Sequence, residues 1–210
     1  MSSAIKRFGV RYPVVQDNKF ATWNAYSNQY WPAEYMIDKS GHVRHAHFGE
    51  GEYQHTEKLL RRLLGVTSAP MTHVANATPN ELLTPESYLG TARIDRLVGD
   101  PVHAGVPWTY QLPATVPQDN LAYGGRWTID KERAVAVKDA RLRLSFSASK
   151  VYLVLGGHGN VDVHVDGKPL RTVRVDGDRL YTLVDSPRAL HALLELHFTP
   201  GISAYAFTFG

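Results

Sequence analysis

The sequence contains no cysteine among its 210 residues. This excludes disulfides, thiolate metal sites and thiol catalysis within the chain, because each needs a sulfhydryl group. The sequence also has no run of 18 apolar residues, so we expect no direct insertion into a membrane. Residues 1–7 lack the apolar segment of a signal peptide, and we therefore predict no export route within this chain.

The sequence also lacks a large excess of either positive or negative charge. The formal net charge is only +3, and the basic residues are scattered apart from the pair Arg61–Arg62. Proteins that bind nucleic acids usually gather their basic residues on one face or along one stripe. The sequence therefore predicts no nucleic-acid partner, and we expect no cofactor.

The first half of the chain is organised around residues 30–41. Pro32 has no N–H group and restricts Trp31 as well, so it belongs at the start of a strand or in a cis bend. Asp38 and Gly41 favour a tight turn, because glycine tolerates positive φ and aspartate bonds its own backbone. Residues 33–48 are therefore predicted to form a β-hairpin.

Four further elements are expected around this hairpin. They are the end of a helix at residues 4–10, a buried strand at 12–17, a helix at 20–26 and a helix at 52–64 that ends at Gly65. The apolar side of the last helix is expected to consist of Tyr53, Leu59, Leu60, Leu63 and Leu64. This order predicts an α/β unit whose sheet is covered on both faces.

The composition changes after Gly65. Residues 66–85 contain three prolines and many small polar residues, which is typical of a linker. Residues 86–210 then show repeated period-two alternation, as in Val161, Val163 and Val165, with closely spaced turns. Seven or more short strands in this pattern predict an antiparallel β-sandwich, jelly-roll-like in topology.

Several motifs together resemble one family over nearly the whole chain. In the first half they are residues 12–14, 23–26, 30–38, 49–53 and 56–57, and in the second half residues 84–90, 125–127 and 204–210. The first set resembles the thioredoxin-like domain of DipZ-type proteins, which are relatives of the TlpA/ResA thiol–disulfide oxidoreductases. The second set is similar to the C-terminal module of that family, which resembles a carbohydrate-binding β-sandwich.

The resemblance implies a division of the chain and a role for Pro32. Residues 1–65 would be the C-terminal part of a thioredoxin-like domain, 66–85 a linker, and 86–210 a carbohydrate-binding-module-like sandwich. Trp31 and Pro32 would form the cis-proline region, which presents backbone to the extended chain of a protein thiol substrate. The family's reactive cysteine pair would lie upstream of the position that corresponds to Ala4. The parent protein is expected to lie outside the cytoplasm, in the periplasm or at the cell surface.

The leading hypothesis is a DipZ-like oxidoreductase fragment that is inactive in isolation, with no catalytic residue of its own. A thiolate is the nucleophile of thiol–disulfide exchange, and no residue here replaces it. A truncated gene product, an excised domain and a split protein are all compatible with this pattern. A scaffold that recruits the missing N-terminal redox half through an exposed sheet edge is a further possibility.

The second half offers a different hypothesis, namely recognition of a glycan or a protein. Exposed aromatic rings can stack on sugars, and the candidates are Trp108, Tyr110 and Trp127, although Trp and Tyr in a sandwich are more often core residues.

A metal site is a weaker hypothesis for the hairpin. His45 and His47 share a strand face with His42 nearby, and Glu50 and Glu52 follow. No clear third ligand is fixed, so we expect half-exposed polar positions and no metal site.

Overall fold

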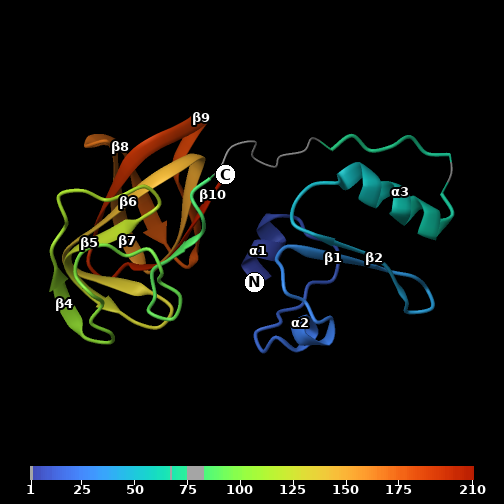
Figure 1. The fold of residues 1–210 in the computed structure, drawn as a ribbon, viewed down its shortest axis with the longest axis horizontal. Coiled ribbons are helices and arrows are strands. Elements are labelled where there is room, and N and C mark those ends of the chain that lie inside the picture. Colours follow the sequence, from blue (N-terminus) through green and yellow to red (C-terminus); the bar gives the residue numbers. More distant parts are fainter. Residues whose placement is uncertain (1, 67, 75–82) are drawn as a thin grey trace. The chain divides into compact units, whose positions relative to one another are not determined.

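The computed structural model describes residues 2–66, 68–74 and 83–210, except the side chain of Ser3. The chain divides into two compact units, Met1–Thr78 and Pro79–Gly210, each described by itself below. The fold is mostly β, with antiparallel sheets, and Figure 1 shows the elements of both units. No helix among the described residues is both long and apolar enough to cross a bilayer.

The first unit is built on one β-hairpin. Strand β1 (Ala33–Ile37) pairs antiparallel with β2 (Val43–Phe48). The predicted turn joins them: the Asp38 carboxylate accepts bonds from the backbone N–H groups of Ser40 and His42, and Gly41 has φ +81°. The hairpin predicted from residues 33–48 is therefore present.

Three helices accompany the hairpin: α1 (Ser2–Arg7), α2 (Ala21–Ala25) and α3 (Tyr53–Leu64). Gly65 adopts φ +68° and ends α3, as the sequence predicts. The expected apolar side of α3 is only partly right. Leu60 and Leu64 are exposed, whereas Leu59 and Leu63 are half-buried.

The buried strand predicted at residues 12–17 is wrong. These residues form no strand, and Tyr12, Val14 and Val15 are exposed. A strand needs a neighbour to receive its backbone hydrogen bonds, and the only sheet described in this unit is the two-stranded hairpin. The expectation of a sheet covered on both faces by helices is not met for the same reason.

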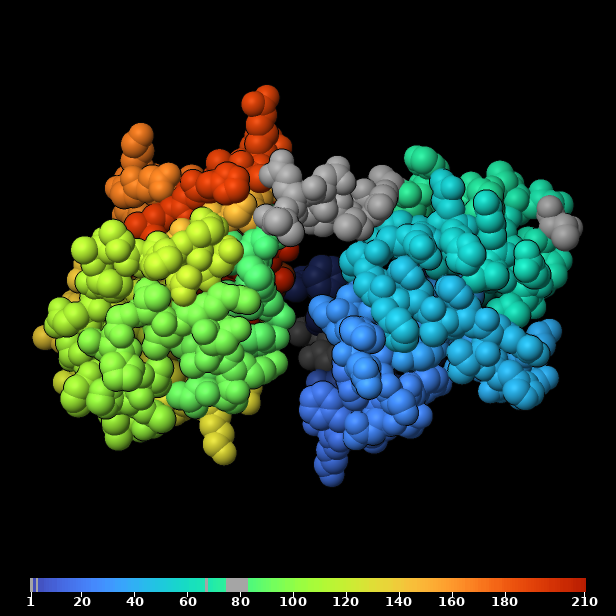
Figure 2. Space-filling view, viewed as in Figure 1, coloured from blue at the N-terminus to red at the C-terminus, as the bar shows by residue number. Residues whose placement is uncertain are grey.

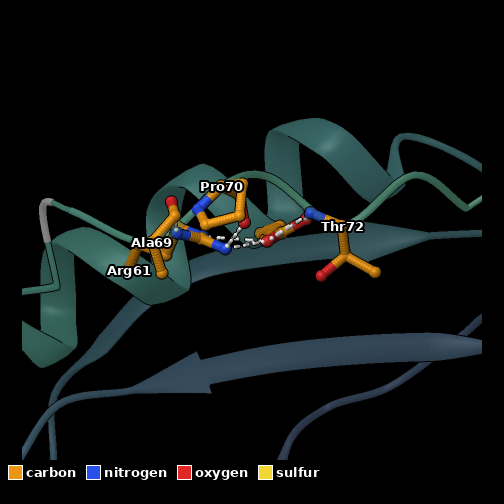
Figure 3. A network of polar contacts seen from close by, with 5 residues as sticks. Arg61, Ala69, Pro70 and Thr72 are labelled. Carbon is orange, nitrogen blue, oxygen red and sulfur yellow. Dashed lines mark hydrogen bonds and ion pairs between the residues drawn. The ribbon is translucent and has the colours of Figure 1, made fainter.

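A polar clamp folds the segment after α3 back onto that helix (Figure 3). The Glu57 carboxylate accepts bonds from the Arg61 guanidinium at 2.6–2.8 Å and from the Thr72 backbone N–H at 3.0 Å. Arg61 also donates to the carbonyl oxygens of Ala69 and Pro70, at 2.5 and 2.6 Å. One charged pair on the helix thus binds the backbone of the following segment at Ala69, Pro70 and Thr72.

Eight strands lie in the part of the second unit that the structure describes, residues 83–210. They are β3 (Ser87–Tyr88), β4 (Pro107–Tyr110), β5 (Leu121–Ile129), β6 (Ala134–Gly156), β7 (His158–Val165), β8 (Lys168–Asp176), β9 (Arg179–Phe198) and β10 (Ser203–Phe209). The sheet order is β3-β10-β6-β9-β7-β8, and β5 pairs with both β4 and β6. All of these pairs are antiparallel except β10–β6.

The predicted period-two alternation decides which side chains enter the core. Val161 and Val163 of β7 are fully buried, whereas Asp162 between them is exposed. The largest fully buried side chains are Trp127, Tyr123, Phe146 and Phe207, surrounded by leucines of β5, β6 and β9. The second unit therefore has one continuous apolar core.

The free end strand β8 carries features that discourage strand addition. It includes Lys168, Pro169, Arg171 and Arg174. Proline and positive charge on an edge strand both oppose pairing with another chain.

Gly125 allows β5 to approach β6 closely at Asp139, where the pairing of the two strands has a β-bulge. It has φ +73°, and a Cβ atom there would lie 1.9 Å from the carbonyl oxygen of Asp139.

We expect Gly125→Ala to lower the free energy of unfolding by clearly more than Gly105→Ala does. Gly105 has the same φ, but a Cβ atom there would meet nothing within 4 Å, so its variant isolates the backbone strain of about 1–2 kcal/mol. The overpacking at Gly125 adds roughly 1–3 kcal/mol. Urea unfolding followed by circular dichroism measures the difference, and equal midpoints for the two variants would contradict the assignment.

The clamp on α3 should open in acid. The pKa of Glu57 is lowered, first by the hydrogen bond from the Thr72 backbone and then by Arg61, against the opposing effect of desolvation. A lowered folded-state pKa contributes stability that is present above the ordinary carboxyl pKa and is lost as the pH falls through the lowered value. We expect the Thr72 amide resonance to move over that acidic window. In Glu57→Gln it should not titrate, and an identical titration in both proteins would refute the clamp.

Candidate functional site

The predicted site residues Trp31 and Pro32 lie at the entrance to β1. The Trp31–Pro32 peptide bond is cis, and the Pro32 carbonyl accepts a hydrogen bond from the Gly49 backbone at 2.9 Å. This bond fixes Pro32 at the end of the hairpin opposite its turn. Trp31 is 83% exposed and is free to meet another molecule.

A cleft of about 600 Å³ opens beside these two residues. Its lining comes from three stretches of chain: Val15 and Asp17; Thr22, Trp23, Tyr26 and Asn28; and Trp31, Pro32, Ala33, Tyr35 and Ile37. The lining is mainly apolar and aromatic, with one carboxylate. Such a cleft suits an apolar or extended polypeptide segment better than a small charged molecule.

Local contacts hold the walls of the cleft in place. The Asp17 carboxylate accepts a hydrogen bond from the Trp23 backbone N–H at 2.8 Å, and this bond is the main cause of the lowered pKa of Asp17. The Tyr35 hydroxyl donates to the Asn28 amide oxygen at 2.8 Å. The Tyr35 ring also packs on Tyr26 with centroids 4.8 Å apart.

The remaining cleft residues were not predicted as site residues. Tyr26 and Tyr35 lie in stretches that carry the family resemblance, but nothing in the sequence marked them or Asn28 as site residues, because only the folded unit brings them beside Pro32. Asp17 also carried no capping signal, because it lies three residues before Phe20, the N-cap residue of α2.

The aromatic candidates of the second unit lie in different environments. Trp127 is fully buried, and its indole N–H donates to the carbonyl oxygens of Gly124 and Arg141, at 2.9 and 3.3 Å. Tyr110 is also buried, and its hydroxyl accepts a bond from the His103 backbone. Neither ring is accessible to a ligand in this structure.

Trp108 is the accessible member of the three. The residue is 44% exposed, and its ring stacks on the His103 ring, with centroids 3.7 Å apart and planes 17° from parallel. One face of the indole is therefore already occupied. Any ligand would meet the edge or the opposite face.

The histidines of the hairpin do not converge on one point. The His42 Nδ1 atom lies 3.7 Å from Asp38, the His47 Nδ1 atom lies 3.6 Å from Glu52, and the His45 ring packs near His55. Across the described ranges, no group of three or more His, Cys, Asp or Glu side chains is arranged to hold a metal ion.

Figure 2 shows, in blue, the surface to which residues 21–50 contribute. Among the described residues of the first unit, Met36 is the one large apolar side chain that is buried. Exposed apolar residues of this unit include Tyr12, Val15, Phe20, Tyr30, Trp31 and Phe48. Apolar residues scattered singly on a surface are normal, so the informative members of this set are Val15 and Trp31, which lie together in the lining of the cleft.

Comparison with known proteins places the chain in a family. Residues 84–210 match the family described as "Thioredoxin like C-terminal domain". The chain belongs to this family, and it is a DipZ-type thioredoxin-like protein. It is 36% identical over 211 aligned residues to the proteins named "Protein DipZ" of Mycobacterium bovis and Mycobacterium tuberculosis. The match covers 96% of this chain and 30% of each DipZ protein, so the chain spans less than a third of their length.

Two other similarities are narrower. The "Thiol-disulfide oxidoreductase YkuV" of Bacillus subtilis is 34% identical over 58 residues, which is 28% of this chain and 39% of that protein. A family two carbohydrate esterase from Clostridium thermocellum, solved in complex with cellohexaose, has 24% identity and a TM-score of 0.38. That match covers 43% of this chain and 31% of the esterase, and it is too weak to support an argument about fold or ligand.

The two tryptophans of the second unit should differ sharply in their effect on stability. We expect Trp127→Ala to lower the free energy of unfolding by about 3–5 kcal/mol, because it empties a filled core position. Trp108→Ala should lower it by less than about 1 kcal/mol, as is usual for a partly exposed residue. Urea unfolding of both variants measures the contrast, and similar losses would show that the burial of Trp127 is misassigned.

Proposed function

We propose that this chain is the part of a DipZ-type thiol–disulfide oxidoreductase that holds a protein thiol substrate, and that it is not redox-active alone. The observation that carries the proposal is the combination of 36% identity to DipZ across 96% of the chain with the complete absence of cysteine. Exchange requires a thiolate nucleophile. The reactive thiols must therefore come from polypeptide outside this sequence.

The cleft supports a substrate-holding role. Trp31 and Pro32 line it together with the apolar residues of β1, and the exposed Trp31 indole offers a large surface for an incoming chain. Aromatic side chains contribute strongly to binding at such surfaces. We propose that residues 1–65 are the C-terminal part of a thioredoxin-like domain, that residues 66–85 form a linker, and that the parent protein works outside the cytoplasm.

We also propose that residues 86–210 form a jelly-roll-like β-sandwich that binds a glycan or a protein partner. The exposed indole of Trp108, stacked on His103, favours this second function. Trp108→Ala is the discriminating variant for it. A ligand found on a glycan array should lose affinity in Trp108→Ala while the unfolding transition stays nearly unchanged.

The redox proposal predicts that the 210-residue chain does not accelerate the reduction of insulin disulfides by dithiothreitol above the rate in buffer alone. The physical reason is that the chain has no sulfur nucleophile. A polypeptide that joins it to the Cys-containing part of a DipZ protein should accelerate the reaction. In that protein, Trp31→Ala should raise KM more than it lowers kcat, because it removes a binding surface. Clear turnover by the isolated chain, or no turnover by the joined polypeptide, would refute the proposal.

A further inference from the structure

A row of polar side chains crosses the sheet of the second unit on the face opposite its core. Arg141 of β6 pairs with His197 of β9, and His197 pairs in turn with Asp162 of β7. The residues that follow Arg141 and His197 in the sequence, Leu142 and Phe198, are buried in the core. Side chains alternate between the two faces of a strand, so Arg141, His197 and Asp162 lie together on the outward face.

A chain of polar contacts fixes the orientation of His197. Its Nε2 atom lies 2.7 Å from the Glu195 carboxylate, which also accepts a hydrogen bond from the Arg143 guanidinium at 2.5 Å. Burial raises the pKa of Glu195, but the bonds from Arg143 and His197 lower it overall, so this carboxylate is ionised near neutral pH. An ionised carboxylate only accepts hydrogen bonds, and the Nε2 atom therefore carries a proton. The Nδ1 atom is left for a ligand, and the side chain is 43% exposed.

A second imidazole lies beside the first on the same face. The ring of His164 packs on the ring of His197 with centroids 4.8 Å apart. The Nδ1 atom of His164 is buried and has no hydrogen-bond partner among the described residues. Two protonated imidazoles at this separation repel each other, and an anion bound next to them offsets that repulsion.

A hollow of about 470 Å³ opens beside His197. The rest of its lining combines charged side chains with an apolar floor, and consists of Lys138, Asp139, Ala140, Arg141, Phe198 and Pro200. Among the described residues, neither Lys138 nor Arg141 forms an ion pair with a carboxylate. Two uncompensated cations thus share the hollow with one acid, Asp139.

We propose that this hollow is a phosphate-binding site, in which Lys138, Arg141 and a protonated His197 donate to the phosphate oxygens. Their three positive charges, less the one negative charge of Asp139, leave two for the ligand. A phosphate monoester carries up to about two negative charges and three acceptor oxygens. A carboxylate has one charge and two oxygens, and would match this set less well. Arginine and lysine are also the side chains that proteins most often use for phosphate.

A second hollow, of about 400 Å³, adjoins His197 on the side of β7 and β8. Its lining includes polar and apolar members, namely Asp162, His164, Pro169, Leu170, Arg171 and Thr172. The Asp162 carboxylate already accepts a hydrogen bond from the Thr172 hydroxyl at 2.6 Å. The organic part of a phosphate ester therefore has room beside the phosphate site. Neither hollow includes Trp108, so the site does not rest on the proposed recognition of a glycan or protein.

Titration of the full chain with inorganic phosphate tests the site. The side-chain NMR signals of the histidines and arginines are followed at constant ionic strength, which keeps general screening fixed. We expect the signals of His197 and Arg141 to shift and saturate. Arg141→Gln should weaken binding about tenfold, because a charge-assisted hydrogen bond is lost. The matched control is Arg174→Gln, which removes an exposed cation of β8 that lines neither hollow and should bind as the parent chain does.

Sulfate separates the role of His197 from the titration of phosphate itself, because sulfate keeps both of its charges near neutral pH. We expect sulfate to bind more tightly as the pH falls from about 8 to 6, the range in which histidine gains a proton and a positive charge. In His197→Gln this pH dependence should disappear. Circular dichroism of each variant checks that the sheet remains folded.

Two further probes distinguish the sources of the phosphate. They are glycerol phosphate and phosphatidylcholine vesicles that contain phosphatidic acid. Binding that is tighter for glycerol phosphate than for inorganic phosphate assigns the site to a soluble ester, and tightest binding to the vesicles assigns it to a lipid headgroup.

Four results would overturn the proposal. They are no saturable shift with any phosphate probe, equal binding by Arg141→Gln, an equal loss in Arg174→Gln, and a pH dependence for sulfate that persists unchanged in His197→Gln. An equal loss in Arg174→Gln would show that only the net charge of the unit matters. None of these measurements involves thiol chemistry or Trp108, so their outcome is separate from that of the proposed function.

Discussion

The pairing of β1 with β2 is the interaction on which the first unit depends. It places Pro32 against Gly49 and sets the direction of the backbone groups along β1. Because a two-stranded hairpin is at best marginally stable alone, its neighbours contribute much of the stability of this unit. The clamp between Glu57, Arg61 and Thr72 and the ring packing of Tyr26 on Tyr35 are two such contributions.

The second unit has the opposite character. Strand β6 pairs with β9 between its residues Arg141 and Leu155. The inward side chains of the two strands help to fill a core that includes Trp127 and Phe146. The first unit therefore leaves most of its large apolar side chains exposed, whereas the second encloses them in a filled core.

Local patterns predicted those elements that need no distant partner. Asp38 and Gly41 define the hairpin turn, and Gly65 ends α3, because both features depend on nearby backbone conformation. The alternation of Val161 and Val163 likewise predicted their burial. The strand expected at residues 12–17 failed, since strand formation requires a neighbour that the described chain does not provide. The frequency of Trp in sandwich cores favoured burial of Trp127, but its full burial and the partial exposure of Trp108 depend on how β4 and β5 pack, which the sequence does not show.

The composition of β8 has a consequence for self-recognition. Two copies of this chain that approached each other through β8 would bring together two strands that each carry Lys168, Arg171 and Arg174 against the single acid Asp176, so the strands would repel each other, and Pro169 would interrupt the ladder. This repulsion is strongest in dilute salt and weakens as counterions shield the strands. The outermost strand of the larger sheet thus keeps copies apart most effectively at low ionic strength.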